Sequence, residues 1–518
     1  MPPSSLTTAQ GADLRAVFTT HGYEVDRVVD RIGSAAHAAL GRNSTVAGVR
    51  ALGEDRDPLA VLTRLWLLQR PVPAAALEAA LPGLVGPLVE AGVLERGPDD
   101  TYRALVDVRP YASDDGASGW VVSDLSPNLD TETHPMRPDF VLGVSSASST
   151  LAQLTLRHPV ATALDLGTGC GVQALHLARH AEMITATDLN PRALELARLT
   201  MIINGLDVDL RLGSLYEPVA GQRFDLVTTN PPYVMSPPRT DADRLAYREG
   251  SWTSDGLVER VVRDGVGHLA EGGTLQVLAN WAHLRGQDWT DRIGGWLAGT
   301  GCDAHVVQRE VLDPYEYVEL WLADAGLAGS PDYARRYAEW LDYFATLGIE
   351  AVGMGWLTLH RAGRDDPWLR VEDWPYGIEQ PIAPAIEAEL AAVDLERGLD
   401  DAGLLSRAWL LAPDVVEETT GVPGAADPQH LVLRQQRGFR RAIEPGTALA
   451  GVLGACDGDL DLATLISSVA GLLDADPAAL TAELLPRIRP LVVDGFLLAD
   501  LSAWVAARAT TDADKSVG

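Results

Sequence analysis

The stretch DLGTGCG at residues 165–171 decides the fold of this chain. It follows an apolar run that predicts a strand at 163–166, and it precedes a predicted helix that begins at Val172. Dinucleotide-binding loops have the spacing G-x-G-x-x-G and would need glycine at 172, so the observed D-x-G-x-G-x-G disfavours NAD. Glycines let the backbone pass close to a ligand, and a helix N-terminus favours a carboxylate.

Outward from this loop, strand and helix signals alternate in the pattern of a parallel α/β sheet. Predicted strands lie at 163–166, 184–187, 208–212, 224–229 and 274–279, with two late strands at 304–311 and 317–323. In a sheet of order 3-2-1-4-5, the first and fourth strands are neighbours at the switch point where ligands bind. We therefore expect an α/β fold with a Rossmann-like, doubly wound, mostly parallel sheet.

The ends of the predicted strands describe a nucleoside ligand with a carboxylate. Asp188 ends the second strand and can accept hydrogen bonds from ribose hydroxyls, while Ser214 follows the third strand, where an adenine would lie. S-adenosylmethionine has the carboxylate, the ribose and the base, so we expect it as the cofactor. The expected cofactor-binding residues are Asp165, Gly167, Thr168, Gly169, Gly171, Asp188, Leu189, Ser214, Leu215 and Asn230.

The fourth strand ends in the sequence NPPY, and these residues are the predicted catalytic group: Asn230, Pro231, Pro232 and Tyr233. The side-chain carbonyl of Asn230 and the backbone carbonyl of Pro231 can accept both N–H bonds of a planar NH2 group. That geometry aims the nitrogen lone pair at a methyl sulfonium. Two prolines stiffen the loop, and Tyr233 can stack on a flat substrate. The alternative is a rigid turn at a strand end.

These motifs resemble those of class I S-adenosylmethionine-dependent methyltransferases, and more narrowly the HemK-like release-factor glutamine methyltransferases with a small methyltransferase domain. The matching pieces are DLGTGCG at 165–171, TDLNPRAL at 187–194, NPPYV at 230–234, Asp255-Gly256-Leu257 and LAEGG at 269–273. The resemblance covers about 135–325. It implies an N-methyltransferase whose acceptor is a protein glutamine amide, and it suggests that the run 139–144 covers the cofactor.

Two other functions stay open. NPPY is shared by enzymes that methylate exocyclic base amines in RNA or DNA, so a nucleic-acid substrate is the first alternative. The second is a nucleic-acid-binding regulator whose methyltransferase-like core senses the cofactor. The net charge of −31, from 41 basic and 72 acidic residues, opposes non-specific nucleic-acid binding. Tyr233-Val234 also favours the glutamine group. We therefore expect a macromolecular partner, with a release-factor-like protein favoured over RNA or DNA.

The 518 residues suggest about three domains at roughly 150 residues each. We predict a helical, winged-helix-like N-terminal domain at 1–125, the methyltransferase domain at 126–328 and a mainly helical C-terminal domain at 329–518. The phrases PLVEAGVL (87–94) and PLVVDGFL (490–497) match at five of eight positions. They are either a structural repeat or two ordinary helix ends with a left-handed glycine.

Other patterns argue against whole classes of protein. No run of 18 apolar residues predicts a membrane span, and the first residues, MPPSSLTTAQ, lack the features of a signal peptide, so we expect a cytoplasmic protein. Three widely separated cysteines exclude a disulfide framework. His176 and His180 are spaced i, i+4 without an evident third ligand, so we expect no metal. An arginine-rich segment at 434–441 is either a contact for RNA or acidic protein or a solvated surface. The oligomeric state is left open.

Overall fold

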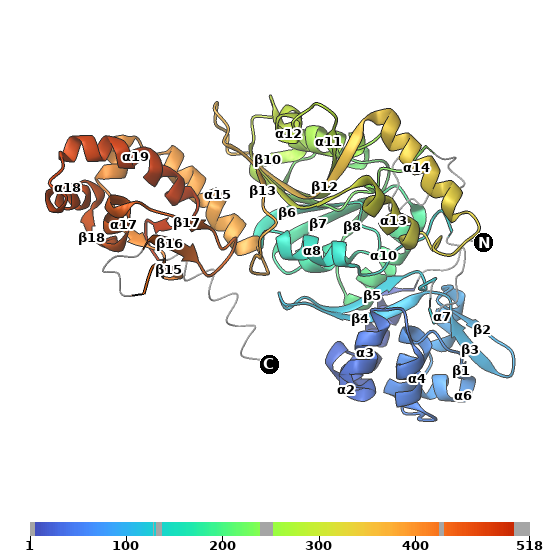
Figure 1. The fold of residues 1–518 in the computed structure, drawn as a ribbon. Helices are drawn as coiled ribbons and strands as arrows, with labels where there is room; N and C mark the ends of the chain where they lie inside the picture. The colour runs from blue at the N-terminus through green and yellow to red at the C-terminus, as the bar shows by residue number, and fades with distance from the viewer. Residues whose placement is uncertain (1–5, 128, 131–136, 239–251, 424–428, 502–518) are drawn as a thin grey trace. The chain divides into compact units, whose positions relative to one another are not determined.

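The computed structural model describes residues 6–127, 129–130, 137–238, 252–423 and 429–501. The chain divides into two compact units (Figure 1). The first comprises Met1–Ala152 and His158–Trp374, and the second comprises Gln153–Arg157 and Pro375–Gly518. All of the predicted catalytic and cofactor-binding residues lie in the first unit.

An eight-stranded sheet of order β13-β11-β12-β10-β9-β6-β7-β8 forms the centre of the first unit. Its parallel part consists of β6 (Val160–Leu166), β7 (Ala181–Asp188), β8 (Asp209–Leu212), β9 (Phe224–Thr229) and β10 (Leu269–Leu284). In chain order these strands are arranged 3-2-1-4-5. The predicted doubly wound, mostly parallel sheet is therefore confirmed.

Helices cover both faces of this sheet, as the two-sided burial of parallel strands requires. One face carries α8 (Ser146–Leu154) and α10 (Pro191–Asn204); the other carries α11 (Gly256–Gly265) and α12 (Trp289–Leu297) (Figure 1). The helix α9 (Val172–Leu177) shares an apolar core with α10. Residues of α11 and α12 pack with the sheet in one apolar core. Residues of α9 and α10 pack with the N-terminal region in another.

The late part of the sheet differs from the prediction. After β11 (Asp303–Leu312), the segment predicted as a strand at 317–323 is the helix α13 (Pro314–Asp324). The strand prediction is wrong because it missed a helix start: Asp313 and Glu316 form a capping box, with Pro314 in the first turn. The helix α14 (Tyr333–Leu347) follows α13.

The sheet also continues past residue 328, where the methyltransferase domain is predicted to end. β12 (Ile349–His360) lies between β10 and β11 and runs antiparallel to both, and β13 (Leu369–Asp373) pairs with β11. The β10–β12 register runs from Thr274 opposite His360 to Leu284 opposite Ile349. A boundary at 328 would separate β12, a central strand, from the rest of the sheet. The last strand of the sheet, β13, ends at Asp373.

The region before the sheet is helical, as predicted. Its helices are α1 (Thr8–His21), α2 (Val25–Ile32), α3 (Ser34–Leu40), α4 (Val46–Leu52), α5 (Pro58–Leu62), the π-helix η1 (Thr63–Leu67), α6 (Ala74–Ala80) and α7 (Val85–Glu90). Strands β1 (Val72–Pro73), β2 (Leu94–Arg96) and β3 (Thr101–Ala104) form an antiparallel sheet of order β1-β3-β2. From α5 onward the order is helix, strand, helix, helix, strand, strand, and the winged-helix-like character of this region stays a prediction. A hairpin, β4 (Asp107–Ala112) and β5 (Ser118–Ser123), follows.

The second unit contains more strands than the predicted mainly helical domain. Its helices are α15 (Ala383–Arg397), α16 (Asp401–Leu405), α17 (Thr447–Gly454), α18 (Leu462–Leu472) and α19 (Pro477–Val493). Its strands are β14 (Ala408–Leu411), β15 (Val415–Thr420), β16 (His430–Gln435), β17 (Ala442–Ile443), β18 (Asp457–Asp461) and β19 (Leu497–Leu498), in sheets of order β18-β14-β19 and β15-β16-β17.

The two similar sequence phrases have the same local structure. Gly92 and Gly495 both have positive φ and end a helix that is followed by a short strand. The next residue donates to a carbonyl five positions back in each case, from Val93 to Leu88 and from Phe496 to Leu491, both at 2.9 Å. Both phrases thus form the end of a helix, with a glycine in the left-handed conformation, followed by a strand. Among the described residues, no helix is long and apolar enough to span a membrane.

Candidate functional site

Three strand ends meet in register at one edge of the sheet. Leu166 of β6 is paired with Thr187 of β7 on one side and with Thr229 of β9 on the other. The next residues along the three strands are therefore Gly167, Asp188 and Asn230. Parallel pairing alone brings the glycine loop, the acidic residue and the NPPY loop together.

The glycine loop is held by short hydrogen bonds. The backbone N–H groups of Gly167 and Thr168 donate to the carbonyl of Thr187 at 2.8 and 2.9 Å. The hydroxyl of Thr168 donates to Oδ2 of Asp165 at 2.6 Å. Asp165 is fully buried, and this desolvation, together with the nearby charge of Asp188, raises its pKa to about 7.

The glycines of the loop have two different roles. Gly167, Gly169 and Gly171 all have positive φ, at 78°, 56° and 83°. A Cβ at Gly167 or Gly169 would meet no atom within 4 Å, whereas one at Gly171 would lie 2.8 Å from the terminal methyl of Met201. Gly171 therefore permits close packing on α10, and the other two glycines leave open space beside the loop. That space fits a cofactor lying against the backbone.

Asp188 connects the end of β7 to the glycine loop. Its Oδ2 accepts from the N–H of Gly169 at 2.9 Å, and its Oδ1 accepts from the N–H of Asn190 at 2.8 Å. Burial raises the pKa of this carboxyl above its usual range. The residue is half-buried, and each carboxylate oxygen can accept a further bond. The geometry suits a ribose diol.

The residues predicted to surround the adenine lie beside Asp188. Leu189 follows it directly and is 66% exposed. The N–H of Gly213 donates to the carbonyl of Asp188 at 3.0 Å, which places Ser214 and Leu215 next to the same strand end. Leu215 has a positive φ of 48° and is half-buried. An exposed leucine near a ribose-binding carboxylate suits the flat apolar face of a base.

Asn230 has a buried acceptor without a donor. Its Oδ1 is buried and has no hydrogen-bond partner within the part of the chain that the structure describes. Pro231 is buried and Pro232 is half-buried. Because buried polar atoms are nearly always paired, the free Oδ1 beside the glycine loop indicates a site for a donor from a ligand.

Tyr233 and the residues after it are braced by α13. The ring of Tyr233 packs edge-on against Trp321 with 6.4 Å between centroids. Burial raises the pKa of Tyr233 to about 12, so its hydroxyl stays protonated at neutral pH. The N–H of Met235 donates to the hydroxyl of the fully buried Tyr317 at 3.1 Å.

The sequence prediction missed Tyr317 because it assigned that segment to a strand. It also missed Asp124, which accepts from Nε of Arg192 on α10 at 3.0 and 3.1 Å and from the N–H of Val141 at 2.8 Å. Asn190 donates to the carbonyl of Asp139 at 2.9 Å, so the run predicted to cover the cofactor does contact the loop after β7. The polar side chains of Asn190 and Arg192, two and four residues after Asp188, were the sequence signal that this loop has further partners.

The weaker candidates have structural partners. His176 lies within 2.7 Å of Asp115 and 2.8 Å of the hydroxyl of Tyr111. No group of three potential ligands among the described residues could hold a metal ion. In the arginine-rich segment, Arg434 bonds to Glu418, and Arg441 is buried near Glu389 and Asp494. At these two positions the arginines are paired with carboxylates of the same chain.

Comparisons with known proteins find relatives of two segments of the chain. Residues 143–288 match the model of the methyltransferase small domain, and residues 20–105 match that of a domain of unknown function, DUF7059. The ribosomal RNA small subunit methyltransferase C of Salmonella arizonae is 31% identical over 140 residues, which are 27% of this chain and 36% of the relative. Its counterpart in Enterobacter sp. strain 638 is 32% identical over 164 residues, which are 31% of this chain and 43% of the relative.

The chain thus aligns with only about two fifths of the length of these curated relatives. A solved structure of a T. thermophilus 16S rRNA N2 methyltransferase in complex with AdoMet and guanosine is 18% identical. It covers 40% of this chain and 53% of that chain, with a TM-score of 0.25.

These matches correct one prediction and confirm others. The expectation of a release-factor-like protein partner is wrong, because the matching relatives are named as ribosomal RNA methyltransferases. The match at 143–288 confirms the methyltransferase activity and its cofactor, S-adenosylmethionine, while the bounds of the predicted domains stay predictions. The roles of the individual site residues stay predictions. The sheet that carries these residues has the class I methyltransferase fold, preceded by a helical region.

Proposed function

We propose that this protein is an S-adenosylmethionine-dependent N-methyltransferase that methylates an exocyclic base amine in RNA. The observation that carries the proposal is the buried, unpartnered Oδ1 of Asn230. Asn230 directly follows Thr229, which is paired in the sheet with the residue before Gly167, and that residue is paired with the residue before Asp188. The names of the relatives support RNA as the substrate.

In this proposal the residues of the NPPY loop bind and orient the acceptor nitrogen. Oδ1 of Asn230 accepts one N–H of the base amine, and the backbone carbonyl of Pro231 accepts the other. The cofactor supplies the electrophilic methyl group. Positioning of this kind can contribute roughly 7–11 kcal/mol to a bimolecular reaction, whereas one neutral hydrogen bond contributes only about 1 kcal/mol. Orientation is therefore the main contribution of the loop.

Tyr233 acts by packing rather than as a base. Its hydroxyl remains protonated because burial raises its pKa to about 12. An exocyclic amine needs no deprotonation before attack, since its proton can leave once the nitrogen carries the methyl group. Tyr233 and Trp321 then form an aromatic wall beside the acceptor.

In this proposal the cofactor lies against Gly167, Thr168, Gly169, Asp188, Leu189, Ser214 and Leu215. Asp165 and Gly171 shape the loop, and Asn230, which the sequence also assigned to the cofactor, contacts the acceptor. Asp165 supports the loop through Thr168, and Asp188 binds the ribose. We also propose that the chain has three parts. The N-terminal region is 1–125, the catalytic part extends to Asp373, where the large sheet ends, and a C-terminal region follows.

Two variants at Asn230 test the proposal. Wild type, Asn230→Ala and Asn230→Asp are incubated with methyl-labelled cofactor and protein-free ribosomal RNA, and the RNA is digested to nucleosides. We expect Asn230→Ala to bind the cofactor normally and to lose at least about a hundredfold in turnover. Asn230→Asp keeps the acceptor oxygens and should retain more activity than Asn230→Ala. Full activity of Asn230→Ala would refute the proposed role.

A further inference from the structure

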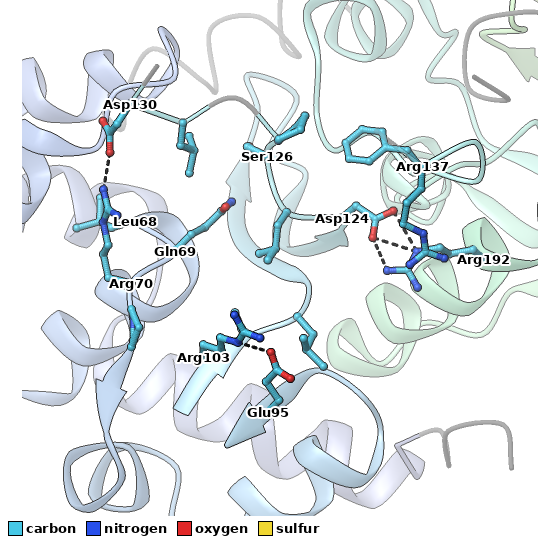
Figure 2. Close-up of a pocket in the computed structure, with 17 residues that line it drawn as sticks. Leu68, Gln69, Arg70, Glu95, Arg103, Asp124, Ser126, Asp130, Arg137 and Arg192 are labelled. Atoms are coloured by element: carbon cyan, nitrogen blue, oxygen red, sulfur yellow. Dashed lines mark hydrogen bonds and ion pairs between the residues drawn. The ribbon is translucent and has the colours of Figure 1, made fainter. Parts of the chain in front are cut away.

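A cavity in the first unit lies next to the cofactor-binding edge but outside the NPPY loop. Its volume is about 570 Å³, within the range of roughly 300–1,000 Å³ that is usual for ligand pockets. Gln69, Arg70 and Arg103 line it from the N-terminal region, and Asp124, Arg137 and Arg192 line it from the side of the sheet (Figure 2). The proposed mechanism does not use this cavity.

Gln69 has an unused donor in the wall of the cavity. Figure 2 shows its side chain extending from the backbone into the cavity. Its Nε2 is buried and makes no hydrogen bond with any residue that the structure describes. Its φ is 51°, a left-handed conformation that is unfavourable for a residue with a Cβ, and it lies two residues after the π-helix η1. Such strain and such an orphaned donor are typical of ligand-binding positions.

The arginines of the cavity keep donors available. Arg103 is paired with Glu95, but its side chain is 62% exposed whereas that of Glu95 is 35% exposed. Arg70 and its partner Asp130 show the same difference, at 45% and 15%. In both pairs the carboxylate is the less exposed partner, so the guanidinium group is the one that faces solvent. Each guanidinium has five N–H donors, so donors remain for a phosphate.

The cavity is also connected to the cofactor-binding loop. Arg192, which lines the cavity, lies four residues after Asp188 and donates to Asp124. The segment that carries Arg137 also carries Asp139, whose carbonyl accepts from Asn190. A ligand in the cavity would thus contact the same short segments that position the loop after β7.

We propose that this cavity binds a nucleotide of the single-stranded RNA substrate outside the target base, with Arg70, Arg103 and Arg137 contacting phosphates and Gln69 donating to a base or phosphate oxygen. The inference rests on the proposed function for the choice of RNA. Four arginines and three acidic residues line the cavity, and Arg137 is paired with Asp139 beside it, so the cavity is close to neutral in a chain whose acidic residues outnumber its basic ones, 72 to 41. Exposed guanidinium groups in a locally neutral cavity provide an entry for RNA on an acidic protein.

The test compares Arg103→Ala and Gln69→Ala with a matched control, Arg96→Ala. Arg96 lies in the same hairpin, is 67% exposed and is paired with Asp100, but it does not line the cavity. Binding of a fluorescein-labelled single-stranded RNA of mixed sequence is measured by anisotropy at several salt concentrations. Unchanged affinity for S-adenosylmethionine verifies that each variant is folded.

We expect Arg103→Ala to weaken RNA binding about tenfold and to reduce the salt slope by about 0.7, the value for one phosphate of a single strand. Gln69→Ala should weaken binding several-fold with an unchanged slope, and Arg96→Ala should bind within about twofold of wild type.

Three outcomes would overturn the inference. In the first, the wild type does not bind the RNA. In the second, both cavity variants bind it as the wild type does. In the third, a polyglutamate peptide competes with RNA as well as unlabelled RNA does, which would indicate a general anion site. The proposed function fails separately, if the wild type transfers no methyl group to RNA while the cavity variants still lose RNA binding.

Discussion

The carboxylate of Asp188 accepts a hydrogen bond from the backbone N–H of Gly169, with 2.9 Å between Oδ2 and N. This bond joins the end of β7 to the loop after β6, so the residue proposed to bind the ribose also fixes the loop proposed to lie against the cofactor. The two parts of the cofactor site are therefore one structural unit. A change at Asp188 should affect both.

We predict that Asp188→Ala weakens S-adenosylmethionine binding about a hundredfold, because it removes two charge-assisted acceptors of roughly 1.5 kcal/mol each. Isothermal titration measures the affinity. Asp209→Ala is the control, because Asp209 lies on the neighbouring strand and is paired on the surface with Arg211. A Kd within threefold of wild type for Asp188→Ala would contradict the assigned role.

Alanine at two glycines of the loop should give opposite patterns. Gly167→Ala meets open space and has only the left-handed backbone to overcome, so it should cost about 1–2 kcal/mol of stability yet abolish cofactor binding. Gly171→Ala adds an overlap with Met201 and should cost about 2–4 kcal/mol. Chemical denaturation and cofactor titration separate the two effects. Normal cofactor binding by Gly167→Ala would show that the open space is not the cofactor site.

The pKa of Asp165 predicts a specific pH dependence of stability. Desolvation raises the pKa of this carboxyl to about 7, against roughly 3.9 in the unfolded chain. The folded state therefore binds the proton more tightly, and the stability contributed by this group is fully present below about pH 4 and is lost as the pH rises through 7.

The comparison of wild type with Asp165→Asn isolates this effect, because asparagine imitates the protonated acid. Between pH 5 and pH 8 the free energy of unfolding of the wild type should fall relative to that of the variant by about 2–3 kcal/mol. Urea denaturation at each pH provides the measurement. Parallel pH profiles for the two proteins would show that Asp165 titrates normally.

The ion pair of Asp255 and Arg292 should contribute to stability rather than to chemistry. The nearly fully buried carboxylate of Asp255 accepts two bonds from Arg292, at 2.7 and 2.5 Å, and one from the N–H of Ala282 at 2.7 Å. Asp255→Ala leaves a poorly exposed guanidinium without its partner and should cost about 3–5 kcal/mol.

The control for this pair is Asp264→Ala, which removes a surface partner of Arg260 on α11 and should cost less than about 1 kcal/mol. Thermal denaturation compares the two variants. A small loss for Asp255→Ala, with an equal loss for the control, would show that the buried pair is not structurally important.

The sequence predicted the parts of the fold that depend on local patterns. The parallel α/β sheet follows from alternating strands and helices, and the positions of Asp188 and Asn230 follow from the strands that they end. The insertion of β12 between β10 and β11 could not be predicted, because it depends on pairing between segments that are far apart in the chain.

Two other features could not be predicted from the hydrophobic pattern of the sequence. The run 317–323 has apolar residues compatible with a strand, and only the capping box at Asp313 indicates the helix. Gln69 resembles an ordinary polar residue in the sequence, since its positive φ and its buried, unpaired amide exist only in the folded chain. Residues of this kind, set by strain and burial, are the ones that the structure adds to the site.

The fate of the transferred methyl group tests the central claim most directly. The protein is incubated with methyl-labelled S-adenosylmethionine and a cell extract, with Asn230→Ala in parallel, and the products are divided between nuclease and protease treatment. The account predicts label that nuclease releases as a nucleoside methylated on its exocyclic nitrogen, and no such label with the variant. Label that resists nuclease and is released by protease would contradict it.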